Sequence, residues 1–216
     1  MSFSKETGFD IAAAMTAMPR AKIRPVLRIA IAYATPMTTW ICFLRGVNVG
    51  GNKMLKMAEL KALFDALKLR DAKTYLQSGN VVFRSDETDR AVLTRRIEDG
   101  IRKKSGMEVK VILRTTDELR KVIAANPLPP EDRNPSALVV AFLAGSIAEK
   151  GKAALTSLKI ASEELHFGEQ EIYLYFPENM ARSKLAAALT EKKVGVNVTA
   201  RNWNTVNALL KMGEEL

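Results

Sequence analysis

The sequence predicts an α/β protein made of two ferredoxin-like halves, each with the order β-α-β-β-α-β, and a helix appended at the C-terminus. Three observations support this prediction. Strand and helix patterns follow that order between residues 38 and 114, and the same order returns between residues 137 and 200. Four prolines between residues 127 and 135 separate the two series and indicate a linker. We therefore expect one half at 38–134 and the other at 135–216.

The first 37 residues lack the patterning of the rest. Their apolar stretch VLRIAIAYA is interrupted by Arg28 and is too short to span a membrane. The sequence AYA at 32–34 resembles a signal-peptidase site, but the segment before it is short and charged. We expect residues 1–37 to be an extension outside the fold, with the functional protein beginning near Met37.

The first half is predicted from alternating strand and helix signals. A buried strand precedes a glycine-rich loop, and an amphipathic helix follows the loop. A hairpin, a helix that stops at Gly106, a strand and a helix capped by Thr115 or Thr116 come next. The stretches are TWICFLR (39–45), MAELKALFDALKL (57–69), KTYLQSGNVVFRS (73–85), DETDRAVLTRRIEDGIRKKSG (86–106), MEVKVILR (107–114) and a helix ending before Pro127.

The second half repeats this order without residue-level similarity. It contains a strand, a helix that includes Gly151, a hairpin with its turn near Gly168, a helix, a short strand and the final helix. The stretches are ALVVAFLA (137–144), SIAEKGKAALTSLK (146–159), EELHFGEQEIYLYF (163–176), ARSKLAAALTEKK (181–193), VGVNVTA (194–200) and RNWNTVNALLKMG (201–213).

Composition limits the kinds of chemistry that the chain can carry. Hydrophobic residues make up 47% of the 216 residues, which is enough for a core. One cysteine, Cys42, excludes an internal disulfide and suits a reducing cytoplasm. With one histidine, His166, no cysteine–histidine zinc site can be built, and we expect this histidine to be structural rather than catalytic. No cofactor or metal is predicted, and no residue is identified as catalytic.

Several of these stretches, taken in order, resemble one known family. FLRGVNVGGNKMLKMAELKALF, TYLQSGNVVF, MARSKLAAAL and ARNWNTVNALLKM are together similar to the bacterial DUF1697 family, from about residue 38 to residue 213. The resemblance implies a two-part α/β protein with ferredoxin-like halves. It implies no activity, because the family is named for the lack of an assigned function.

The loop after the first strand is the first candidate site. Gly46 and Gly51 have the spacing of a Walker A loop, but Asn52 precedes the lysine and Met54 replaces the hydroxyl residue. A strand, a glycine loop and a helix N-terminus nevertheless form an arrangement that binds anions, and the loop offers basic side chains. The alternative is a simple β-α turn. The candidate ligand-binding residues are Arg45, Asn48, Gly50, Gly51 and Lys53.

Other short polar segments supply further candidates, each with a structural alternative. Gln77, Ser78 and Asn80 belong to a hairpin turn, and their side chains are suited to hydrogen bonding with a ligand. Two predicted helix starts add basic and capping residues, namely Arg182, Ser183 and Lys184 at one and Arg201 and Asn202 at the other. Ser183 and Asn202 are equally suited to capping their helices.

The aromatic residues are suited either to packing in the core or to stacking on a ligand. Trp203 either anchors the last helix in the core or stacks on a ring of a ligand. Tyr173 and Tyr175 share one face of a strand, which suits stacking on single-stranded RNA, although the RNA-recognition signature is missing. Packing of that face against the other half is the alternative.

The net charge of +9 favours an anionic partner. We therefore expect a small cytosolic protein that binds a phosphate-bearing small molecule in a basic cleft, with no membrane partner. A nucleic-acid-binding module and a protein-interaction module without a ligand are the alternatives. The sequence does not determine the oligomeric state or whether the protein is an enzyme.

Overall fold

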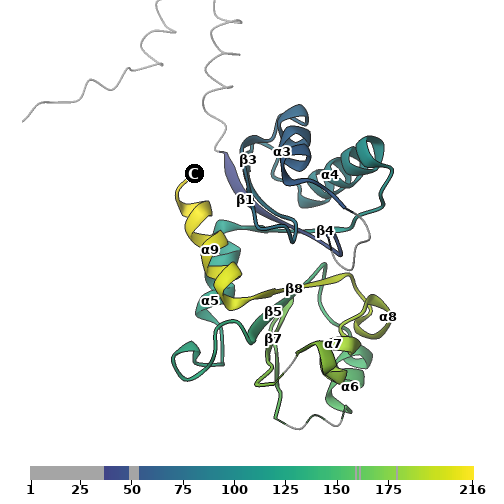
Figure 1. The fold of residues 1–216 in the computed structure, drawn as a ribbon, viewed down its shortest axis with the longest axis vertical. Helices are drawn as coiled ribbons and strands as arrows, with labels where there is room; N and C mark the ends of the chain where they lie inside the picture. Colours follow the sequence, from purple (N-terminus) through teal and green to yellow (C-terminus); the bar gives the residue numbers. More distant parts are fainter. Residues whose placement is uncertain (1–36, 49–53, 159, 161, 179) are drawn as a thin grey trace, which may run out of the picture. The chain divides into compact units, whose positions relative to one another are not determined.

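The computed structural model describes residues 37–216 apart from residues 49–53, 159, 161 and 179. Residues 37–216 form one compact unit (Figure 1), and its described part contains two four-stranded antiparallel sheets. The first sheet has the order β2-β3-β1-β4 and the second has the equivalent order β6-β7-β5-β8. The strands are β1 Thr38–Leu44, β2 Arg70–Tyr75, β3 Asn80–Ser85, β4 Val111–Thr115, β5 Leu138–Leu143, β6 Glu164–Phe167, β7 Glu171–Tyr175 and β8 Val198–Asn202.

The helices complete two ferredoxin-like halves and add a helix at the C-terminus, as the sequence predicts. The α-helices are α3 Met57–Ala66, α4 Arg90–Ser105, α5 Thr116–Ala124, α6 Glu149–Thr156, α7 Lys184–Ala188, α8 Glu191–Val194 and α9 Trp203–Glu214. Short 3-10 helices occupy Pro130–Asp132 and Met180–Arg182. In the described part of the chain no helix is long and apolar enough to cross a membrane.

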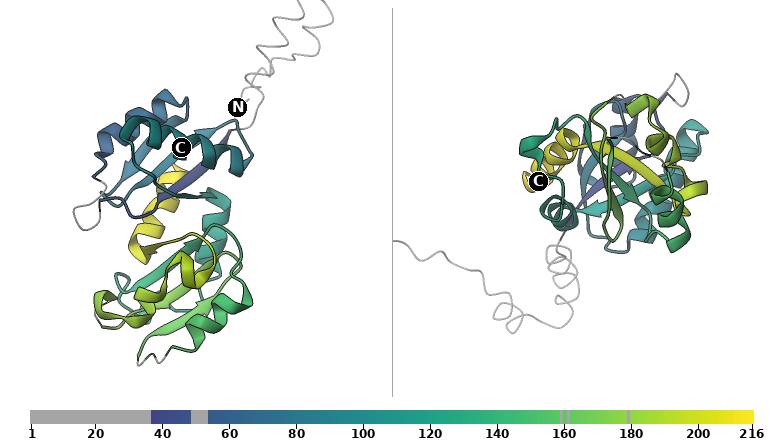
Figure 2. Two further views of the ribbon diagram at one scale, coloured as in Figure 1. Left: turned by 90° about the vertical axis from the view of Figure 1, so that its right-hand side faces the viewer. Right: turned by 90° about the horizontal axis from the view of Figure 1, so that it is seen from below.

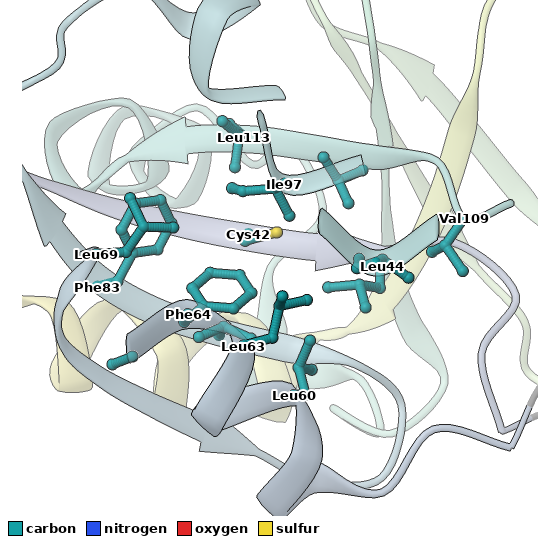
Figure 3. Packing of buried hydrophobic residues seen from close by; sticks show 14 of the residues in the cluster. Cys42, Leu44, Leu60, Leu63, Phe64, Leu69, Phe83, Ile97, Val109 and Leu113 are labelled. Carbon is teal, nitrogen blue, oxygen red and sulfur yellow. The ribbon is translucent and has the colours of Figure 1, made fainter. Parts of the chain in front are cut away.

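One face of the first sheet packs against α3 and α4. Alternate residues of β1 point to this side because successive side chains of a strand point to opposite faces. Figure 3 shows Cys42 and Leu44 of β1 with Phe64 of α3, Phe83 of β3 and Ile97 of α4 in this cluster. Cys42 and Phe64 are fully buried, so this face is an ordinary hydrophobic core.

The other face of the first sheet packs toward the second sheet. Phe43 of β1 and Phe142 of β5 stack here with their ring centroids 4.2 Å apart. Helices α5 and α9 border the same cluster, and α9 contacts β1, β3, β5 and β8. Figures 1 and 2 both show α9, in yellow, between the first half and the second. The two halves therefore share a core.

Helices α6, α7 and α8 cover the outer face of the second sheet. The sequence predicts one helix over residues 181–193, and this prediction is wrong, because extended backbone at Thr190 separates α7 from α8. Leu185 and Val194 are both fully buried in this core. They are nine residues apart, which places them on opposite faces of a continuous helix, about 180° apart. The break lets both side chains reach the same core.

The proline-rich segment is fixed to the second half rather than extended as a free linker. Arg133 donates to both carboxylate oxygens of Glu164 on β6, at 2.8 and 2.9 Å, and its guanidinium lies 5.4 Å from the ring centre of Tyr175. Leu128 is buried in the shared core. These contacts hold the segment after α5 against the β6–β7 hairpin.

Candidate functional site

Two arginines occupy equivalent positions in the two halves. Arg114 of β4 lies opposite Ile41 of β1, and Arg201 of β8 lies opposite Val140 of β5. Each is the residue before the one that caps the following helix. Both side chains therefore point toward the other sheet, and each reaches into the opposite half.

Arg201 is held by six hydrogen bonds. Its Nε donates to Asn80 Oδ1 at 2.5 Å, and Nη2 donates to the carbonyl oxygens of Leu44 and Ser78 at 2.8 and 2.9 Å. The remaining bonds go to Gly79 O, Thr199 Oγ1 and Ala200 O. Burial lowers the pKa of Arg201 to about 10, so the side chain is charged at neutral pH. Arg201 thus joins β8 to the ends of β1 and β3.

The loops beside Arg201 are held by their own polar groups. Asn48 donates through Nδ2 to the carbonyl oxygens of Leu55 and Gln77, at 2.9 and 2.7 Å, and accepts from Leu55 N at 2.7 Å. Arg45 Nη1 donates to Glu191 Oε2 at 3.0 Å and to Asn197 Oδ1 at 2.7 Å. Arg45 and Asn48 therefore already bind protein groups.

The structure brings part of the predicted site together. Candidates at the ends of β1, β3 and β8 share one corner of the first half, namely Arg45, Asn48, Gln77, Ser78, Asn80 and Arg201. Gly50, Gly51 and Lys53 lie outside the described residues. The prediction that Arg201 lies at a helix start is wrong, because the residue belongs to strand β8 and its side chain is buried.

The remaining candidates have mainly structural contacts. Asn202 accepts from Thr205 N at 3.0 Å and caps α9, and Trp203 is buried in the shared core. Ser183 accepts from Ala186 N at 3.0 Å and caps α7, so Arg182, Ser183 and Lys184 adjoin the core on the outer face of the second sheet. They are not part of the corner around Arg201.

Arg114 makes fewer bonds than its counterpart. Nη1 donates to Leu113 O at 2.9 Å, and Nη2 donates to Leu143 O at 2.8 Å and Gln170 O at 2.9 Å. A guanidinium carries five N–H donors, so two are left over. The group also lies 5.9 Å from the ring centre of Phe142. Burial, with a smaller effect from Arg90, lowers the pKa of Arg114 to about 10.

An acid and a phenol lie on β7 near Arg114. Glu171 lies opposite Phe142 and is 9% exposed, and Tyr173, two residues further on the same face, is 2% exposed. The Tyr173 hydroxyl donates to Val122 O at 2.8 Å. Burial, and to a lesser degree the charge of Glu171, raises the pKa of Tyr173, which therefore stays neutral.

These residues line a cavity of about 620 Å³ between α5 and the β6–β7 hairpin. Arg114, Glu171 and Tyr173 belong to its wall, together with Glu118, Lys121, Val122, Ala125, Pro127 and the 166–170 stretch. The volume falls within the range of small-molecule sites, about 300–1,000 Å³. One wall comes from the first half and the other from the second.

Sequence reasoning missed this cavity. Arg114 stands at the end of an alternating strand, and only the equivalence of the two halves relates it to Arg201. His166, expected to be structural, is exposed on β6 and lines the cavity. Within the described ranges, no group of three or more histidine, cysteine, aspartate or glutamate side chains is placed to hold a metal ion.

Comparison with known proteins places the chain in a family. The sequence profile "Protein of unknown function (DUF1697)" matches residues 37–173. The chain belongs to the DUF1697 family. Among solved structures, the conserved bacterial protein SP0830 from Streptococcus pneumoniae is similar, with 24% identity and a TM-score of 0.65 over 82% of this chain and 99% of that one. No curated protein matches the chain.

Proposed function

We propose that this DUF1697 protein binds a small molecule with an anionic group, and that the ligand occupies the cavity beside Arg114. One observation carries the proposal: a cavity of about 620 Å³ has a buried guanidinium in its wall that retains two N–H donors. A buried cation with free donors favours an oxyanion, because hydrogen bonds to charged groups are the stronger kind.

Lys121 adds a second positive charge at this cavity. It lies in the last turn of α5, is exposed and belongs to the lining. A phosphate-bearing ligand, which the sequence favours, fits two basic groups better than one. Wild-type affinity for inorganic phosphate is therefore expected to depend on both Lys121 and Arg114.

The loop site predicted from sequence is the second location for the same ligand class. Its residues 49–53 lie outside the described part, while Arg45 and Asn48 already bind protein groups. The cavity is favoured because its arginine retains donors. A cytoplasmic location, nucleic acid as the ligand and an interaction module without a ligand stay predictions from sequence.

His166 provides a local test, because it is the only histidine in the chain and lines the cavity. Its imidazole resonances are followed by NMR at constant pH while inorganic phosphate is added to the full chain. We expect a saturable shift. Lys121→Gln is expected to weaken binding by about 1–2 kcal/mol, the size of one charged hydrogen bond.

Arg114→Lys is the second variant, with circular dichroism to confirm folding. It keeps the charge but loses the planar fork, so weaker binding is expected. Lys103→Gln, an exposed lysine of α4 outside the cavity lining, is the control. Phosphate binding that leaves the His166 signals unmoved, or that Lys121→Gln and Arg114→Lys do not weaken, would overturn the assignment of the cavity.

Salt dependence separates this function from nucleic-acid binding. The affinity for a polyanion falls steeply with salt through counterion release. A single phosphate in a cavity is expected to show a shallow dependence. A short single-stranded oligonucleotide that binds with a steep slope, while phosphate does not bind, would support the alternative.

A further inference from the structure

Glu171 is a buried acid with little protein hydrogen bonding. Its Oε2 accepts from Gln170 N at 3.3 Å, and its Oε1 lies 3.5 Å from the Tyr173 hydroxyl oxygen. That hydroxyl has one proton and directs it to Val122 O at the shorter distance of 2.8 Å. Oε1 is therefore left without a strong donor, although buried carboxylates normally have hydrogen-bond partners.

Comparison of the two halves shows that a neutral amide occupies the position equivalent to this acid. Glu171 lies opposite Phe142 where Asn80 lies opposite Phe43. In the first half the neutral amide of Asn80 accepts directly from the equivalent arginine at 2.5 Å. In the second half Arg114 donates to carbonyl oxygens instead, and Glu171 acts on it through charge.

Glu171 thus lacks a strong donor and Arg114 keeps two N–H donors, and both residues line the same cavity. We infer that the ligand is a zwitterion, with its anionic group at Arg114 and a protonated amine at Glu171. An ammonium group supplies the donors that Oε1 lacks, and its charge offsets the buried carboxylate. Glu169 lies in the same lining and adds a further carboxylate to the cavity, whereas Glu118 is paired with Arg90.

This inference rests on the proposed function and narrows it. Two chemistries share the required groups, the amino carboxylates and the amino phosphates. The cavity lining is compatible with both, since a guanidinium binds carboxylate and phosphate alike. The test therefore includes one matched set of each.

The experiment follows the His166 resonances of the full chain while small probes are added. The carboxylate set is 4-aminobutanoate, butanoate and butylamine, and the phosphate set is phosphoethanolamine and ethyl phosphate. We expect each zwitterion to bind about 10-fold more tightly than its anion, the ratio that one charged hydrogen bond supplies. The set with the lower dissociation constants identifies the acid group.

Glu171→Gln is the decisive variant, because it removes the charge and keeps the shape. It is expected to bring each zwitterion within about two-fold of its anion while the anion itself binds at least as well as before. Glu178→Gln, at an exposed position outside the cavity lining, is the charge-matched control and should leave the preference intact.

The two proposals fail in different ways. If the anions bind as tightly as the zwitterions, or Glu171→Gln leaves a ten-fold preference unchanged, the zwitterion inference is wrong and anion binding stands. If none of the five probes shifts the His166 signals of the wild-type chain, both proposals are overturned for these ligand classes. If butylamine alone binds, the anion site at Arg114 is wrong.

Discussion

The regions around Arg201 and Arg114 occupy equivalent places in the two halves of the fold, but they differ in how many hydrogen bonds the arginine makes. Arg201 has six hydrogen bonds and an uncharged partner in Asn80. Arg114 has three, beside a buried acid and a cavity. In this repeated fold, Arg201 uses its donors to join the two halves, whereas Arg114 keeps two donors beside the cavity that we propose as the ligand site.

The largest expected effect comes from separating the halves. Residues 38–134 expressed alone would expose Phe43, Ile41 and Ile112, which are buried in the shared core. We expect this fragment to aggregate or remain partly unfolded, because one face of its sheet loses its cover. Size-exclusion chromatography and urea titration test this. A monomeric fragment with a cooperative transition would show that the first half folds without the second.

Replacing the two arginines measures the difference between the corners directly. Arg201→Ala is expected to lower the free energy of unfolding by about 3–5 kcal/mol, because it leaves several buried acceptors without donors. Arg114→Ala is expected to cost about 1–3 kcal/mol, because fewer acceptors are affected. Urea titration followed by tryptophan fluorescence gives both values.

Arg182→Ala, at an exposed position, is the control for this pair and should change stability by less than about 0.5 kcal/mol. Equal losses of unfolding free energy for Arg201→Ala and Arg114→Ala would contradict the view that Arg201 joins the two halves more strongly than Arg114 does.

The glycines in the two turns provide the next test. Gly79 has φ of 73°, and a Cβ there would lie 2.4 Å from Val47 Cγ2 and 2.8 Å from Leu44 Cβ. Gly79→Ala is therefore expected to cost about 2–4 kcal/mol. At Gly168 a Cβ would meet the end of the Glu171 side chain, 2.1 Å from Oε1.

A flexible side chain can move, so Gly168→Ala is expected to cost less than about 1 kcal/mol while it displaces the Glu171 carboxylate. Thermal unfolding gives the stability difference, and the His166 NMR signals report the change in the cavity. If Gly168→Ala lost as much stability as Gly79→Ala, a Cβ would be accommodated equally poorly in the two turns.

The caps of α5 and α9 provide the last test of stability. Thr115 and Glu118 form a capping box on α5, while Asn202 caps α9. Thr115→Ala and Asn202→Ala should each cost about 1 kcal/mol. Burial acts to raise the pKa of Glu118, but the Thr115 N–H and the Arg90 guanidinium outweigh it, so the pKa is lowered.

A lowered pKa in the folded state fixes the sign of the pH effect. The contribution of Glu118 is present above its unfolded pKa and is lost as pH falls through the folded value. Glu118→Gln should therefore reduce the loss of stability between about pH 5 and pH 3, whereas Asn202→Ala should leave that slope unchanged. Parallel slopes for Glu118→Gln and the wild-type chain would contradict the assigned role.

The fold was predictable from sequence because its signals are local. The continuous apolar runs of β1 and β5, the helix stop at Gly106 and the cap at Thr115 each depend on a few neighbouring residues. The break between α7 and α8 was not predictable, because it follows from the need of Val194 to reach a core assembled from distant strands.

The candidate site was less predictable for a related reason. Basic residues at predicted helix starts suggested an anion site, but the Arg201 guanidinium is used by acceptors more than 100 residues away in sequence, among them Asn80 and Leu44. The cavity combines α5 with a hairpin about 50 residues later, and a sequence pattern does not show which side chains meet across such a distance.

The burial of Cys42 has a consequence for measuring all of these effects. The thiol lies on the central strand β1 with no exposed surface, and burial raises its pKa. Because only the thiolate is a good nucleophile, alkylating reagents are expected to spare the native protein and to react once the first sheet opens. Because the chain has one thiol, the rate at which it is alkylated measures how often the first sheet opens, and mass spectrometry detects the added mass.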